Sequence, residues 1–120
     1  MTKQISFTKQ QHQVLPEFRR KISHAESTED IKKFFYGTTR ELFDLVFEGQ
    51  MDLNYDDIGL MPGSKDKYWV SERLLNRGSF KTVWNQSDLS TMVGRFARTS
   101  LNRYVHLEKH PEKTNAKIRM

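Results

Sequence analysis

The sequence contains no cysteine, few prolines and no long hydrophobic run. Without cysteine, the chain can form no disulfide bond, thiolate metal site or cysteine nucleophile. The densest apolar stretch, residues 42–47, is interrupted by Asp44 and is far too short to cross a bilayer. Residues 1–13 hold only Ile5 and Phe7 as strongly apolar side chains, so they lack the apolar core of a secretory signal. We therefore expect a cytoplasmic protein with no membrane partner.

Size and aromatic content favour one folded domain. A chain of 120 residues has room for a single core, and eight Phe, four Tyr and two Trp supply apolar surface that a disordered chain lacks. We expect this domain to span residues 1–110, with residues 1–7 mobile. Residues 111–120 contain little that is apolar and are predicted to form a basic flexible tail.

Three segments show apolar residues at helical spacing. The first spans residues 8–24 and includes Pro16, which implies either a start near Leu15 or a kink. The second follows the capping residue Ser27 and ends at Gly49. The third follows another cap at residues 87–88 and ends before Pro111. Gly37 lies inside the second helix at a cost of about 1 kcal/mol, which a close helix contact or a kink would explain.

The middle of the chain has a weaker pattern. Residues 50–66 are rich in turn-forming residues, and Asp66 could cap a short helix over residues 67–76. Residues 80–84 alternate apolar and polar, which is typical of a short strand, although irregular chain fits as well. The predicted fold class is mainly α, a small single-core bundle of three to five helices with this strand as an optional addition.

Charge is distributed unevenly along the chain, whose net charge is +5. Residues 1–40 carry eight basic against four acidic side chains, residues 41–80 carry four against eight, and residues 81–120 carry eight against three. A basic–acidic–basic layout suits a surface for a polyanion beside an acidic patch, or segments that pack with complementary charges.

The last helix carries the clearest functional signal. At 100° per residue, its basic side chains fall on the face opposite Phe96 and Tyr104, with Arg103 at the edge of the core face. Arg and Asn side chains commonly bind phosphates and base edges. The predicted nucleic-acid contacts are Arg95, Arg98, Asn102, Arg103 and Lys109, joined by Arg19, Arg20 and Lys21 if the two helices lie together.

Other motifs are incomplete. Residues 55–76 could form a helix-turn-helix, but Gly59 and the acidic composition favour a plain helix–loop–helix. Asp52, Asn54 and Asp56 place oxygen ligands as the first positions of an EF-hand loop do, yet Asp57 stands where that loop requires Gly, so Asx turns and a helix cap explain these residues better. We find no nucleophile, phosphate-loop or metal motif, and expect a non-enzymatic protein with neither metal nor cofactor.

Two functional hypotheses follow. The first is a small basic nucleic-acid-associated or transcription-regulatory protein that uses the last helix. The second is a protein-interaction module or homodimer without a nucleic-acid role, whose partner surface is the aromatic and acidic segment from Tyr55 to Trp84. Exposure of Tyr68, Trp69 or Trp84 in the folded protein would favour the second, because monomers seldom expose large apolar patches.

Overall fold

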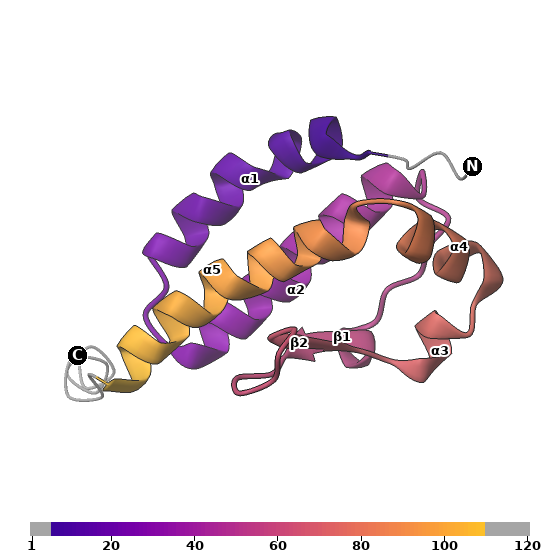
Figure 1. Cartoon of the computed structure of the whole chain (residues 1–120). Helices are drawn as coiled ribbons and strands as arrows, with labels where there is room; N and C mark the ends of the chain where they lie inside the picture. Colours follow the sequence, from indigo (N-terminus) through magenta and orange to yellow (C-terminus); the bar gives the residue numbers. More distant parts are fainter. Residues whose placement is uncertain (1–5, 110–120) are drawn as a thin grey trace.

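Three amphipathic segments form the three long helices of the protein. The computed structural model describes residues 6–109, the side chain of Lys109 excepted, and is mainly α-helical (Figure 1). Helices α1 (Thr8–Ser23), α2 (Thr28–Val46) and α5 (Leu89–Lys109) pack against one another along their apolar faces. The predicted mainly-α bundle is confirmed, and its short strand segment lies in residues 58–60 and 68–70 instead of residues 80–84. No helix in this part of the chain is both long and apolar enough to span a bilayer.

Helix α1 begins at Thr8 and continues through Pro16, so it does not start near Leu15. Burial of Val14, Phe18 and Ile22 on one face offsets the hydrogen bond that proline cannot donate. The backbone before this helix is tied to the start of α5, because the Phe7 N–H donates to Asp88 Oδ1 at 2.9 Å. Residues 1–5 and 110–120, including the predicted tail, lie outside the described part of the chain.

Helix α2 starts where Ser27 predicts and ends at Val46, three residues before the predicted stop at Gly49. The Ser27 hydroxyl accepts a hydrogen bond from the Asp30 N–H at 3.1 Å, and the chain leaves the helix with Gly49 at a φ of 76°. Gly37 is exposed, and a Cβ there would meet nothing within 4 Å. A close helix contact therefore does not explain this glycine.

The middle of the chain differs from the prediction. Residues 67–76 do not form one helix, because Ile58–Leu60 (β1) and Tyr68–Val70 (β2) pair as an antiparallel hairpin. Residues 80–84 are not a strand either, since they lie inside α4 (Gly78–Gln86). The 3-10 turn η1 (Tyr55–Asp57) precedes the hairpin, and the short α3 (Glu72–Leu75) follows it. This hairpin excludes both the helix-turn-helix and the helix–loop–helix.

Aromatic packing explains why residues 80–84 are helical. In a helix, Phe80 and Trp84 share one face, and both rings contact Phe43 of α2, with ring centroids 5.7 Å and 6.4 Å away. The ring of Tyr68 packs edge-on against Trp84, with the centroids 6.2 Å apart. These contacts fix α4 and the hairpin on the bundle, which places the loop between the two strands beside α5.

Candidate nucleic-acid interface

The predicted polar face of α5 is displayed on the surface. Arg95, Arg98 and Asn102 are exposed, whereas Phe96 and Ser100 between them are buried in the core. Their spacing of three and four residues gives one continuous stripe along the helix. Lys109 closes the helix, and its side chain lies outside the described atoms.

Arg103, predicted as a nucleic-acid contact, makes a structural contact in the fold. It is half-buried, and its Nη2 donates a hydrogen bond to the backbone oxygen of Ala25 at 3.0 Å. Ala25 lies in the link between α1 and α2, so this contact holds the link against α5. Arg103 therefore makes a structural contact and is not part of the exposed stripe on α5.

The basic cluster of α1 is only partly available. The structure places α1 beside α5, as the prediction required. Arg19 is exposed, but Arg20 forms an ion pair with Glu17 one turn earlier, and Lys21 is half-buried. The ion pair and the burial leave Arg19 as the cluster's most available cation.

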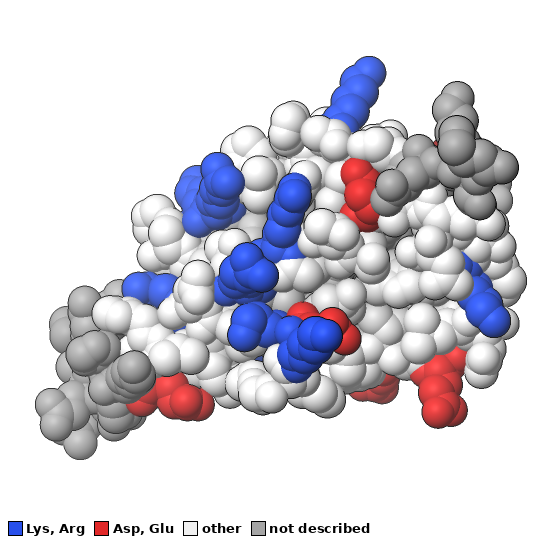
Figure 2. Space-filling model, viewed as in Figure 1, with Lys and Arg blue, Asp and Glu red and all other residues white. Residues whose placement is uncertain are grey.

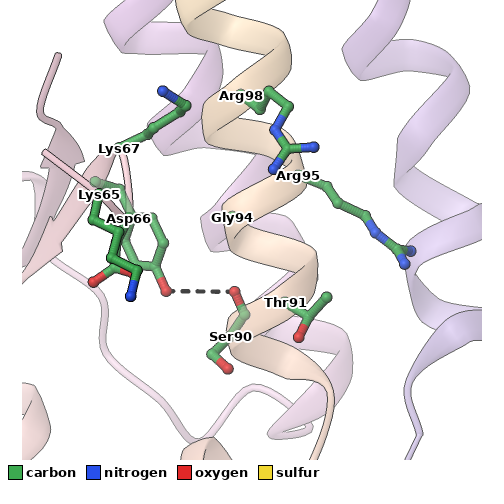
Figure 3. A pocket seen from close by; sticks show the side chains of 9 residues that line it. Lys65, Asp66, Lys67, Ser90, Thr91, Gly94, Arg95 and Arg98 are labelled. Carbon is green, nitrogen blue, oxygen red and sulfur yellow. Dashed lines mark hydrogen bonds between the residues drawn. The ribbon is translucent and has the colours of Figure 1, made fainter. Parts of the chain in front are cut away.

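A pocket between α5 and the hairpin loop adds basic residues that the sequence reasoning missed. It has a volume of about 370 Å³. Figure 3 shows the loop on one side and α5 on the other, with Arg95 extending away from the loop. The lining residues are Lys65, Asp66, Lys67, Tyr68, Ser90, Thr91, Gly94, Arg95 and Arg98.

The hairpin loop holds its lysines in a defined backbone conformation. The Ser64 hydroxyl accepts from the Lys67 N–H at 2.8 Å, and the Met61 N–H donates to the Lys67 oxygen at 2.9 Å. Lys67 itself has a φ of 68°, a left-handed conformation that costs a non-glycine residue about 1–2 kcal/mol. Asn or Gly would be less strained at this position.

Tyr68 links the hairpin to α5 beneath the pocket. Its hydroxyl donates to the backbone oxygen of Ser90 at 3.4 Å, the contact dashed in Figure 3. Burial, helped by the negative charge of Asp66, raises the pKa of the Tyr68 hydroxyl to about 12. The hydroxyl therefore stays protonated and remains a donor throughout the physiological range.

The cations around the pocket are not neutralised by neighbouring carboxylates. Ion pairs such as Arg20–Glu17, Lys32–Glu29 and Arg73–Asp57 form elsewhere, and within the described part of the chain no residue of the pocket forms one. Figure 2 shows basic side chains gathered on the same face of the molecule. Four cations against one acid, Asp66, give the pocket a net positive field that attracts anions.

Comparison of the chain with protein-family models, with curated proteins and with solved structures finds no match. The chemistry of the pocket is therefore what indicates the kind of ligand that the protein binds. Pocket geometry and charge favour anion binding, and they offer no nucleophile paired with a base.

The acidic loop before the hairpin is organised by protein contacts. The Asn54 side chain and Asp57 form a reciprocal cap on η1, which is the Asx-type explanation expected from sequence. Nowhere between residues 6 and 109 do three His, Asp or Glu side chains gather as metal ligands would. The carboxylate of Asp57 is buried and is bound instead by Arg73 and by the Ser71 hydroxyl, the latter at 2.7 Å.

This Asp57 network predicts an acid-sensitive step in stability. The Arg73 guanidinium hydrogen-bonded to Asp57 lowers the pKa of that carboxyl from 3.8 to about 2, against the opposing effect of burial. Because the folded-state pKa is depressed, the stabilisation is complete above about pH 4 and is lost as the pH falls through about 2. Half-exposure of Arg73 weakens the pair, so we expect a loss of about 1–2 kcal/mol in the free energy of unfolding.

Urea denaturation across this pH window measures the loss. An Asp57→Asn variant is the control, because it has no carboxylate to protonate at this position and should lose less stability over the same window. Parallel losses in the two proteins would show that Asp57 does not cause the acid sensitivity.

Proposed function

We propose that this protein binds nucleic acid, without catalysis, through a surface that we call the basic surface: Lys65, Lys67, Arg95, Arg98 and Asn102. The observation that carries the proposal is the pocket, which is lined both by lysines of the hairpin loop and by arginines of α5. Two separate elements thus contribute cationic residues to the lining of one pocket, and none of these residues forms an ion pair within the described part of the chain. A solvated helix face alone would not need this arrangement.

The residue types match contacts to a phosphate backbone. Arginine forks and lysine ammonium groups bind phosphate oxygens, and the hydroxyls of Ser90 and Thr91 at the pocket add uncharged donors. Asn102 lies one turn further along α5, where it could contact sugar or base edges. Backbone contacts dominate this set, so we expect affinity with little sequence preference.

The competing protein-interaction hypothesis has less surface to use. Tyr68 and Trp84 are packed against the core and against each other, which removes them from an exposed aromatic patch. Trp69 and Tyr55 stay accessible, but they line a cavity of only about 220 Å³. A cavity of that volume has room for a small chemical group. A stable protein interface instead needs an extended surface, of which about 800 Å² is buried on each partner.

Salt dependence tests the proposed function. The protein should bind fluorescent random duplex and single-stranded DNA, and log Kd should rise linearly with log salt. Each cation that contacts a duplex phosphate adds about 0.9 to that slope, so four contacts predict a slope of about 3–4. Fluorescence anisotropy between about 50 and about 200 mM salt measures it. Absence of salt-sensitive binding even at the lower concentration would exclude the proposal.

A further inference from the structure

The other face of the hairpin carries a second cavity, which we call the aromatic pocket. Side chains alternate along a strand, so Tyr68 faces α5 whereas Trp69 faces the opposite side, where α2 lies. The aromatic pocket has a volume of about 220 Å³. Its lining residues are Lys32, Tyr36, Tyr55, Asp56, Ile58, Gly59, Leu60 and Trp69.

Trp69 lines this pocket because Gly59 makes room for it. The two residues are directly paired across the hairpin, and a Cβ at position 59 would lie 2.6 Å from the indole Nε1. The indole therefore lies across the bare backbone of Gly59, where any larger residue would displace it. Trp69 is half-buried and stands outside the hydrophobic core cluster, which Tyr68 and Trp84 both join. A tryptophan placed in a cavity and not in the core is available to bind.

Two tyrosines form a corner of the same pocket. The rings of Tyr36 and Tyr55 have centroids 5.1 Å apart and are tilted by 59°. The Tyr36 hydroxyl donates to the backbone oxygen of Leu53 at 2.7 Å, which fixes that ring, while Tyr55 is 49% exposed. Walls set at an angle suit a rounded group, as in the aromatic cages that bind quaternary ammonium ligands.

The charges at the aromatic pocket favour a cation. Asp56 places a carboxylate at its edge, and the only cation in its lining, Lys32, lies 3.6 Å from Glu29 and is thereby partly neutralised. The faces of Trp and Tyr rings attract weakly hydrated cations through their negative quadrupoles.

We propose that the aromatic pocket binds an alkylated ammonium group. Trp69, Tyr36 and Tyr55 supply the ring faces, and Asp56 supplies the countercharge. Such a group is rounded, cationic and weakly hydrated, which matches the angle of the walls and the sign of the field. The proposal is independent of nucleic-acid binding, because it uses different residues on the opposite face of the hairpin.

A titration with choline, followed by NMR, tests the site directly. The resonances of the Trp69 indole, assigned with a Trp69→Phe variant, and of the Tyr55 backbone should shift saturably. The control ligand is the neutral isostere of choline, in which carbon replaces nitrogen. It has the same shape without the charge and should bind at least several-fold more weakly. Equal binding of the two ligands, or no saturable shift with choline, would overturn the proposal.

Substitutions separate the ring and charge contributions. Tyr55→Ala removes an exposed ring outside the core cluster and should weaken choline binding about threefold to thirtyfold. Asp56→Asn should weaken choline binding and leave binding of the neutral isostere unchanged. The matched control is Asp52→Asn, which alters an exposed acid of the same loop outside the pocket. Equal effects of the two Asp variants would refute the assigned role of Asp56.

The same titration distinguishes two sources of the alkylated ammonium. A peptide with one trimethylated lysine carries the group on a protein, whereas choline carries it on a small molecule. Tighter binding of the methylated peptide than of both choline and the unmodified peptide would assign the source to a modified protein. Tighter binding of choline would assign it to a small molecule. If neither ligand bound, the proposal would be wrong.

Discussion

Replacing Arg95 and Arg98 together by glutamate is expected to weaken DNA binding by at least about a hundredfold at about 50 mM salt. Charge-assisted hydrogen bonds to phosphate contribute about 1.5–3 kcal/mol each, and the introduced carboxylates add repulsion to the lost attraction. Both arginines are exposed and pair with no acid in the described structure, so the variant should fold normally. The slope of log Kd against log salt should fall by about 2.

A second charge-reversed variant separates the basic surface from net charge alone. Lys33→Glu with Arg40→Glu makes the same change in total charge on exposed residues of α2 that do not line the pocket. We expect it to weaken binding less than about threefold. Anisotropy titrations of both variants against one labelled duplex, with thermal melting to verify folding, give the comparison. Equal losses in the two variants would mean that DNA responds to overall charge and not to this surface.

The long helices could be predicted because their signals are local. Ser27 caps α2, and the buried residues of α1 and α5 recur at helical spacing. The hairpin could not be predicted in the same way. Trp69, Val70 and Leu74 fit a helical face as well as they fit a strand followed by a turn of helix. What decides between them is pairing with residues 58–60 and packing against α4, both of which are tertiary contacts.

The residues of the candidate site also differ in whether local signals or tertiary contacts place them. Arg95, Arg98 and Asn102 could be found because periodicity alone separates them from the core face of α5. Lys65 and Lys67 were not assigned to this surface because they lie in the segment that is net acidic, and only the hairpin places them beside α5. The net charge of a segment therefore does not predict the charge of the surface that its loops form, because a loop can place a few cations apart from the acids of the same segment.

The position of that loop rests on the aromatic cluster around Phe43, and Phe43→Ala is expected to destabilise the protein by about 3–5 kcal/mol. Phe43 is fully buried, and its ring contacts those of Phe47, Phe80 and Trp84. Truncation removes the ring and leaves a cavity between α2 and α4. Small domains have about 5–15 kcal/mol of total stability, so a large part of it depends on this residue.

Helix α4 should be affected more than the rest of the bundle, because Phe43 of α2 contacts both Phe80 and Trp84 of α4, whereas Phe47, just beyond α2, contacts only Phe80. Urea denaturation measures the global loss, and hydrogen exchange should show faster exchange in α4 than in α1. The matched control is Leu45→Ala on the same helix, where the side chain is 37% exposed and the expected loss is below about 1 kcal/mol. If both variants lost the same stability, the aromatic cluster would not be what fixes α4, and with it the hairpin, against the bundle.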